Sequence, residues 1–217
     1  MKDMYKLIIF TTILLSVIGC IVFAPAKSSL DPVTVVIPAT EAQKRFEKAM
    51  QVVLQHEGGA TNDKDDPGGA TQWGVSLRFL KQIGYDVDKD GDVDADDIFK
   101  LTRTDADKIY LKHFWDKYNF DDIQQLDIAI KLFDTCVSIG PIPTYKLIRA
   151  TFNEILEEKV PASGPIDLDI LYMLNMVYSD VFLEEFRKQQ ADHYLKIIKA
   201  NPKLAKYKNG WLKRAAS

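Results

Sequence analysis

The sequence predicts a mainly α-helical protein with at most a small β-hairpin. After residue 40, apolar residues recur in most segments at the 3.6-residue period of amphipathic helices. Glycine, proline and asparagine separate these segments, as expected at helix ends. A short hairpin around residues 70–75 is the one strand pattern outside the N-terminal region. With 217 residues, of which 47% are hydrophobic, the chain can bury one domain core, with or without a small appended lobe.

Residues 1–26 are predicted to be a signal peptide or a signal anchor. A short basic start precedes an apolar run over residues 7–24, and Ala24-Pro25-Ala26 gives a cleavage-site pattern. The run is just long enough to span a bilayer if it is not cleaved. Both versions predict export to the periplasm or cell envelope, with the protein either secreted or anchored in the inner membrane. Residues 27–40 are expected to be a linker.

Charge is unevenly spread along the chain. The formal net charge is −3, but residues 86–97 hold seven Asp and one Lys, which amounts to −6 and leaves +3 for the rest. A weakly basic remainder would suit an anionic polymer only slightly. We expect no nucleic-acid partner and a monomeric chain. If residues 1–26 are removed, Cys136 is the one cysteine left, so no disulfide is predicted and Cys136 is expected in the core.

The strongest candidate for chemistry is Glu57, at the end of the first predicted helix. This helix begins with a capping box at residues 40–43, and the apolar positions 46, 50 and 53 place Glu57 on the same buried face. Gly58 and Gly59 then end it. Burial and the negative end of the helix dipole both disfavour the ionised carboxylate, so its pKa should rise and it could donate a proton near neutral pH. The alternative is an exposed Glu at a frayed helix end.

The loop after Glu57 carries further polar candidates. Asp63, Asp65 and Asp66 precede a Pro-Gly-Gly turn, where glycines let the backbone approach a ligand closely. Thr71 and Trp73 follow. An indole ring near carboxylates can stack on a sugar ring, whereas its alternative role is to cap the core.

Residues 86–97 have the spacing of a calcium loop. Oxygen donors stand at loop positions 1, 3, 5, 7, 9 and 12, and Gly91 stands at position 6. Position 12 is an Asp, as in dockerin-type loops, but dockerins carry two loops and this chain shows one. We therefore predict one structural Ca²⁺ and no cofactor for catalysis; a solvated acidic turn is the alternative. The predicted ligands are Asp86, Asp88, Asp90, Asp92 and Asp97.

The rest of the chain is predicted to form a series of helices. Ser76 is expected to cap a helix over residues 77–83, and Thr102 or Thr104 the next one. Further helical segments are predicted at residues 122–139, 144–157 and 167–199, the last as one or two helices. Asp134 lies in an apolar helix and should be paired if it is buried. His113 lacks a second ligand at metal spacing and is interpreted as structural.

Several of these motifs together resemble the glycoside hydrolase family 108 lysozymes. They are His-Glu-Gly-Gly at 56–59, Asp-Pro-Gly-Gly-Ala-Thr-Gln-Trp-Gly-Val-Ser at 66–76, and Ile109-Tyr110 with Phe114-Trp115. Leu-Phe-Asp-Thr-Cys-Val-Ser-Ile-Gly at 132–140 and Gly-Trp-Leu-Lys-Arg at 210–214 resemble that family's predicted peptidoglycan-binding lobe. Ser138 departs from the Asn usual there. The resemblance implies a lysozyme-like helical fold, with a catalytic lobe at residues 41–122 and a peptidoglycan-binding lobe at residues 123–217.

The resemblance also implies an activity. The expected reaction is that of an N-acetylmuramidase, which cuts the β-1,4 bond between N-acetylmuramic acid and N-acetylglucosamine in peptidoglycan strands. The family's catalytic Glu corresponds to Glu57. Related phage-type lysozymes follow it with an Asp and a Thr, to which Asp66 and Thr71 correspond in spacing, although Asp63 and Asp65 compete. The outcome at the anomeric carbon, retaining or inverting, is left open.

Two other functions remain open at this point. A lytic transglycosylase would act on the same polymer and would also need one Glu. A calcium-dependent wall-binding or secretion-assisting protein would need no catalysis at all. Prophage lysis, wall remodelling and opening of the wall for secretion are all compatible with an exported muramidase.

Overall fold

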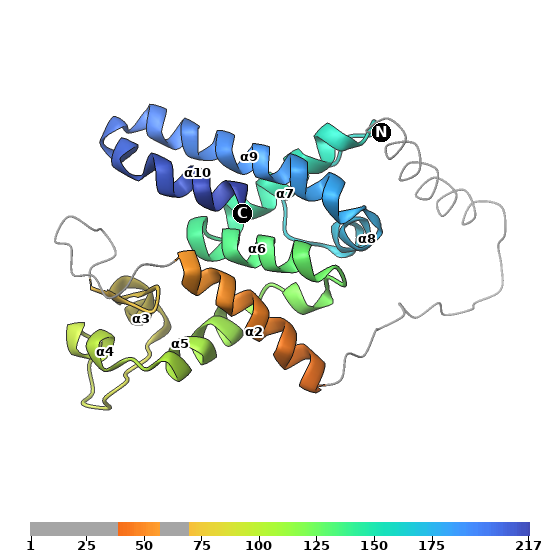
Figure 1. Ribbon diagram of the computed structural model, residues 1–217. Coiled ribbons are helices and arrows are strands. Elements are labelled where there is room, and N and C mark those ends of the chain that lie inside the picture. The colour runs from red at the N-terminus through yellow and green to blue at the C-terminus, as the bar shows by residue number, and fades with distance from the viewer. Residues whose placement is uncertain (1–38, 57–69) are drawn as a thin grey trace. The chain divides into compact units, whose positions relative to one another are not determined.

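The computed structural model describes residues 39–56 and 70–217 (Figure 1). These residues are mainly helical, with one two-stranded antiparallel sheet, as the sequence predicts. They group into an N-terminal unit, residues 43–119, and a C-terminal unit, residues 120–217, to which residues 39–42 also belong. Within the described residues, no helix combines the length and hydropathy needed to cross a membrane.

The N-terminal unit has short elements around a small aromatic and aliphatic core. Phe46, Met50 and Val53 of its first helix are at most 7% exposed, and the ring of Phe46 meets the buried Trp115 edge-on at 5.9 Å between centroids. The same positions form the apolar series of the sequence. The elements are α2 (Ala39–His56), β1 (Thr71–Gln72), β2 (Val75–Ser76), α3 (Leu77–Ile83), α4 (Ala95–Lys100), α5 (Arg103–Tyr110) and the π-helical turn η1 (Leu111–Trp115).

Polar caps set the helix starts in this unit. The Ser76 side chain accepts the Phe79 backbone N–H at 3.3 Å, so α3 begins at Leu77 as predicted. Thr102, and not Thr104, caps α5, where it forms a reciprocal capping box with Asp105. The structure starts α2 at Ala39, one residue before the expected cap, which is within the usual variation of helix ends.

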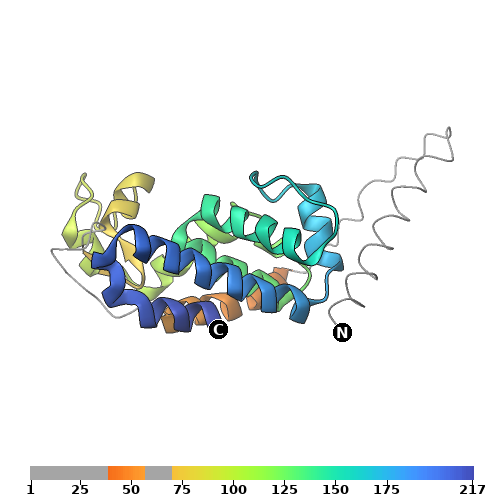
Figure 2. The ribbon, with the colours of Figure 1, turned by 90° about the horizontal axis from the view of Figure 1, so that it is seen from above.

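The C-terminal unit is a helical bundle. In both views, α9 runs beside α7 and α10 (Figure 1, Figure 2). Four phenylalanines, all at 0% exposure, form much of its core, namely Phe133, Phe152, Phe182 and Phe186. The elements are the 3-10 turn η2 (Phe120–Asp122), α6 (Leu126–Ile139), α7 (Pro141–Ile155), α8 (Leu168–Met176), α9 (Ser179–Ala200), the 3-10 turn η3 (Pro202–Tyr207) and α10 (Lys208–Ala216).

Two predicted helix starts were wrong by several residues. The helix expected from residue 122 begins at Leu126, because the chain before it bonds to the end of α8 instead. There, the Gln124 N–H donates to Asn175 Oδ1 at 2.8 Å and the Gln125 amide donates to the carbonyl of Leu174 at 3.0 Å. The helix expected from residue 144 begins at Pro141, since proline fits the first helical position, where no N–H is needed.

A buried arginine orders the loop between α7 and α8. Arg149 is 3% exposed, and its guanidinium donates to the Pro165 carbonyl at 2.7 Å and to the Asp167 carboxylate at 2.8 Å. The same carboxylate caps α8 through the Ile170 N–H. One cation therefore fixes a loop that the sequence marks only as proline- and glycine-rich.

A buried ionic cluster joins α6 to the last helix. The Asp134 carboxylate is 1% exposed and accepts two bonds from Arg214, at 2.8 Å from Nη2 and 3.1 Å from Nε. The pairing expected for a buried Asp134 is thus confirmed. Lys131 Nζ donates to the carbonyls of Arg214 at 2.8 Å and Ala215 at 3.0 Å, which are orphan acceptors at a helix end. Burial lowers the pKa of Lys131 to about 8, against the opposing effect of Asp134.

Replacing Arg214 tests how much this cluster contributes. Arg214→Ala removes the guanidinium from a buried carboxylate, so the free energy of unfolding should fall by about 3–5 kcal/mol in urea titrations. Arg103→Ala is the matched control, because Arg103 forms an exposed pair with Asp107 and should cost less than about 1 kcal/mol. Equal losses in the two variants would contradict a special contribution from the buried cluster.

Candidate functional site

The predicted acid and its predicted partner follow α2 in the sequence. Glu57 and Asp66 fall outside the described residues, as do Asp63 and Asp65. Up to His56, α2 keeps the apolar positions 46, 50 and 53 buried. The roles of Glu57 and Asp66 stay predictions.

The described part of the candidate site is a two-stranded hairpin. Thr71 pairs with Ser76 and Gln72 with Val75 in antiparallel register. The Gln72 side chain donates to the Leu101 carbonyl at 2.7 Å, which ties the hairpin to the segment between α4 and α5. Thr71 is half-buried in β1. This strand is held by its pairing with β2 and by the bond from Gln72 to Leu101.

Trp73 stands at the tip of this hairpin. It has a φ of 54° and the next residue, Gly74, a φ of 76°, which suits a tight turn between two strands. Left-handed backbone is uncommon for a bulky residue. The indole is 39% exposed, so it does not form part of the buried core. Part of Trp73 is therefore open to solvent at the hairpin tip.

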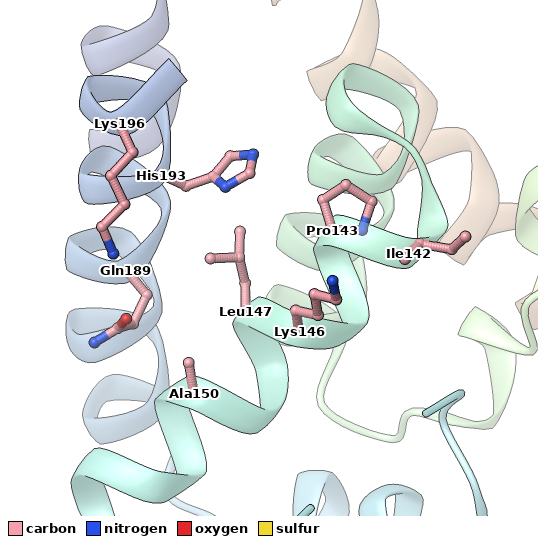
Figure 3. A pocket seen from close by; sticks show the side chains of 8 residues that line it. All are labelled: Ile142, Pro143, Lys146, Leu147, Ala150, Gln189, His193 and Lys196. Carbon is pink, nitrogen blue, oxygen red and sulfur yellow. The ribbon is translucent and has the colours of Figure 1, made fainter. Parts of the chain in front are cut away.

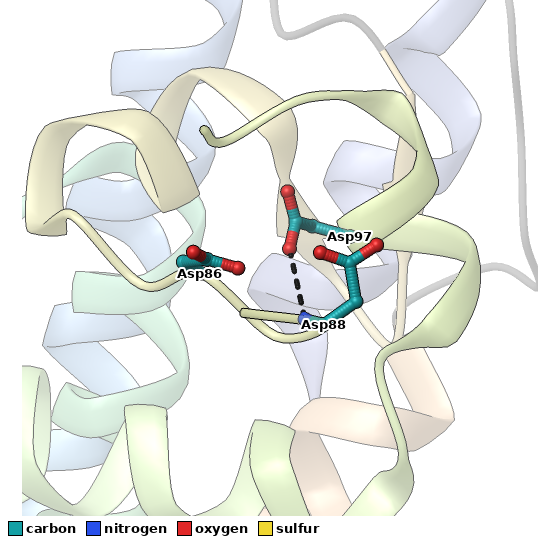
Figure 4. A group of neighbouring side chains, drawn as sticks. All are labelled: Asp86, Asp88 and Asp97. Atoms are coloured by element: carbon teal, nitrogen blue, oxygen red, sulfur yellow. Dashed lines mark hydrogen bonds between the residues drawn. The ribbon is translucent and has the colours of Figure 1, made fainter. Parts of the chain in front are cut away.

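The acidic loop connects α3 to α4 and gathers its carboxylates. Asp86, Asp88 and Asp97 each place an oxygen within 4.8 Å of the others (Figure 4). A second such group consists of Asp92, Asp94 and Asp97. Asp97 is common to both groups and is 1% exposed. Four of the five predicted ligands fall in these groups, and Asp90 does not.

Side-chain acceptors shape the loop backbone. The Asp86 carboxylate accepts the Gly91 N–H at 3.0 Å, and that of Asp97 accepts the N–H groups of Val87 at 2.6 Å and Asp94 at 2.8 Å. Gly91 has a φ of 104°, a conformation that only glycine adopts easily. Because a carboxylate offers about four acceptor sites, the Asp97 oxygens can still accept a cation.

The two ends of the loop differ in their electrostatics. Negative charges crowd together around Asp92, whereas the protein's own Lys100 pairs with Asp88. The pKa of Asp92 is raised, chiefly by the negative charge of Asp90, so the carboxylates repel one another. The Lys100 ammonium bonds to Asp88 and lowers the pKa of that carboxyl group. The contact of Lys100 was not predicted from the sequence, although a lysine in the last turn of a short helix after an acidic loop was a possible signal. Donor type and spacing fit a hard divalent cation.

His113 lies against an aromatic ring and not in a metal cluster. Its ring meets Phe79 edge-on at 6.1 Å between centroids. Burial lowers the pKa of His113, with help from the nearby Lys112 and Lys117. Among the residues that the structure describes, the groups suited to hold a metal consist of aspartates. The structural interpretation of His113 agrees with these contacts.

Comparison with known families identifies the class of protein. Residues 50–140 match the family model described as "Glycosyl hydrolase 108". The match begins in α2, covers the hairpin and the acidic loop, and ends at the turn after α6. This part of the chain therefore resembles a glycosyl hydrolase 108 domain, which supports a glycoside hydrolase of lysozyme type and agrees with the resemblance seen in the sequence.

A solved structure resembles the fold over most of the chain. SagA of Brucella abortus has 24% sequence identity and a TM-score of 0.62, over 80% of this chain and 91% of that chain. At this identity, the likeness shows a shared fold. A comparison with curated proteins gave no match.

Proposed function

We propose that the protein is an exported N-acetylmuramidase that cuts the β-1,4 bond between N-acetylmuramic acid and N-acetylglucosamine. The observation that carries this proposal is the glycosyl hydrolase 108 match over residues 50–140, which contains the Glu-Gly-Gly sequence at 57–59. The match supports a peptidoglycan hydrolase of lysozyme type. The bond and the catalytic residues are our extension of it.

In this mechanism, Glu57 protonates the glycosidic oxygen as the bond to the leaving sugar lengthens. A site at the end of α2, on the face that buries Phe46, Met50 and Val53, would disfavour the ionised carboxylate and keep the proton available. Asp66 stabilises the positive charge that develops on the sugar ring or orients a water molecule. Thr71 holds that water, and Trp73 stacks on a sugar ring at the hairpin tip.

The acidic loop binds one Ca²⁺ in a structural role. The proposed ligands are Asp86, Asp88, Asp92 and Asp97, with Asp90 at the fifth predicted position. A cation there would offset the mutual repulsion that raises the pKa of Asp92. It would also fix the conformation of the loop that connects α3 to α4. The ion takes no part in bond cleavage.

Residues 123–217 hold the peptidoglycan strand in this proposal, and the chain acts as a monomer. Export follows from residues 1–26, which either are removed or anchor the protein in the inner membrane. These residues lie outside the described part of the chain.

Calcium should stabilise the protein measurably. Adding Ca²⁺ to EDTA-treated protein should raise the melting temperature, because metal binding favours the folded state. Asp86→Asn removes a ligand charge and should shrink that increase, whereas Asp96→Asn, an exposed residue outside the ligand positions, should preserve it. A melting curve unchanged by calcium in the parent protein would remove the calcium proposal.

The role of Glu57 can be tested without altering the shape of the side chain. Glu57→Gln should slow the release of fragments from purified sacculi by about 10²–10⁴-fold, the usual contribution of a general acid. Glu47→Gln is the matched control, since Glu47 lies exposed on the same helix and should leave the rate unchanged. Release by Glu57→Gln at the parent rate would show that another residue supplies the proton.

A further inference from the structure

A groove runs along the C-terminal unit between the first turns of α7 and the second half of α9. One cavity of about 260 Å³ lies here, and Figure 3 shows His193 reaching from α9 toward α7, with Leu147 across from it. A second cavity of about 380 Å³ adjoins it and shares two lining residues, Pro143 and His193. The two cavities are therefore neighbours lined within a single unit, and together they are called the groove below.

The first half of the groove combines an apolar floor with cationic sides. Leu147 is 7% exposed and forms the floor, while the ammonium groups of Lys146 and Lys196 stand at the exposed edge on α7 and α9. Among the described residues, no carboxylate lines either cavity. Glu185, one turn before Gln189 on α9, already accepts bonds from Gln189 and Lys188. The described lining of the groove is therefore positively charged.

Two further features favour an anion at this end. The groove begins at the N-terminal turns of α7, where the helix dipole is positive. His193 adds a polar ring to the side that α9 forms. Burial, and then the charge of Lys196, lower the pKa of His193, and a neutral imidazole offers one donor and one acceptor.

The second half of the groove is aromatic but poorly suited to stacking on sugars. Trp211 stacks on Tyr194 at 5.2 Å and on Tyr207 at 5.7 Å between centroids, so protein rings already cover much of its surface. Tyr194 is 1% exposed, and its hydroxyl bonds to Ser138 at 3.2 Å and accepts the amide of the buried Gln190 at 3.1 Å. This end is an apolar wall with a small polar floor.

We propose that this groove binds the acidic stem peptide of peptidoglycan, with Lys146 and Lys196 pairing with its carboxylates and the apolar wall accepting its small side chains. A glycan chain fits less well, because sugar sites rely on open aromatic faces and acidic hydrogen-bond acceptors. The peptide is the part of the polymer that carries carboxylates along a flexible chain. This inference rests on the proposed function, since it names a second part of the same substrate that the enzyme holds.

Binding of an isolated peptide tests the inference directly. The probe is N-acetyl-L-alanyl-γ-D-glutamyl-meso-diaminopimelate, titrated calorimetrically into the full chain carrying Glu57→Gln. A second probe is the same peptide with its carboxyl groups converted to amides. The acidic peptide should bind, and the amidated form should bind at least about tenfold more weakly, because ion pairs with two lysines are lost.

Variants of the protein then locate the binding. Replacing both Lys146 and Lys196 with alanine should weaken binding of the acidic peptide at least about tenfold, for the same reason. Lys199→Ala, an exposed lysine on the same helix outside the groove, should leave the affinity unchanged. All three positions are exposed, so melting curves should coincide with that of the parent.

Two results would overturn the inference. One is equal affinity for the acidic and amidated peptides, and the other is unchanged affinity in the double lysine variant. If the protein with Glu57 intact still releases fragments from sacculi in either case, the proposed function stands and the groove has another role. If release fails while lysine-dependent peptide binding persists, the groove binds the peptide and the muramidase proposal is wrong.

Discussion

The C-terminal unit depends on a buried ionic cluster at the end of the chain. The buried Asp134 carboxylate on α6 takes its bidentate partner, the guanidinium of Arg214, from the last helix, so one buried charge is matched by another. Lys131 adds a second tie by capping the end of that helix. The two ties set how α10 lies on α6 and α9. They thereby place Trp211 against Tyr194, which forms one wall of the groove.

The N-terminal unit has mostly short regular elements and is held together in part by side-chain hydrogen bonds. Its core is small, its helices are short and its sheet has two residues in each strand. Side-chain acceptors therefore replace regular backbone pairing in several places. The side chains of Ser76 and Thr102 cap helices. Gln72 bonds the hairpin to Leu101, and the Asp97 carboxylate accepts the N–H of Val87 across the acidic loop. A loop built from carboxylates concentrates negative charge, which gives a physical reason for a cation at this position.

Local signals made much of the fold predictable from sequence. The helix over residues 77–83, its Ser76 cap and the hairpin follow from capping chemistry and turn residues, which act within a few positions. The position of Asp134 in an apolar helix predicted that it needs a partner if buried. It did not show which partner, because Arg214 is 80 residues away. The start at Leu126 was missed for the same reason, since its cause is a contact with α8. Helix α10 was missed because Gly210 and its short length weaken the periodic signal.

In the candidate sites too, features set by local spacing were predictable and features set by distant contacts were not. Spacing placed the acidic loop, and the structure brings four of its five predicted ligands into compact groups. The groove leaves no local signal in the sequence, because its lysines come from two helices and matter only when α7 and α9 lie side by side (Figure 2). An enzyme that cuts the glycan at one unit and holds the acidic peptide at another would recognise both components of its polymer.

The chemical identity of the cut ends tests the central claim most directly. Sacculi digested by the full chain in heavy-oxygen water can be separated and weighed by mass spectrometry. Hydrolysis predicts reducing N-acetylmuramic acid ends that carry one heavy oxygen, because water attacks the anomeric carbon of that sugar. Anhydromuramic acid ends without the label would show an intramolecular reaction and contradict the muramidase proposal.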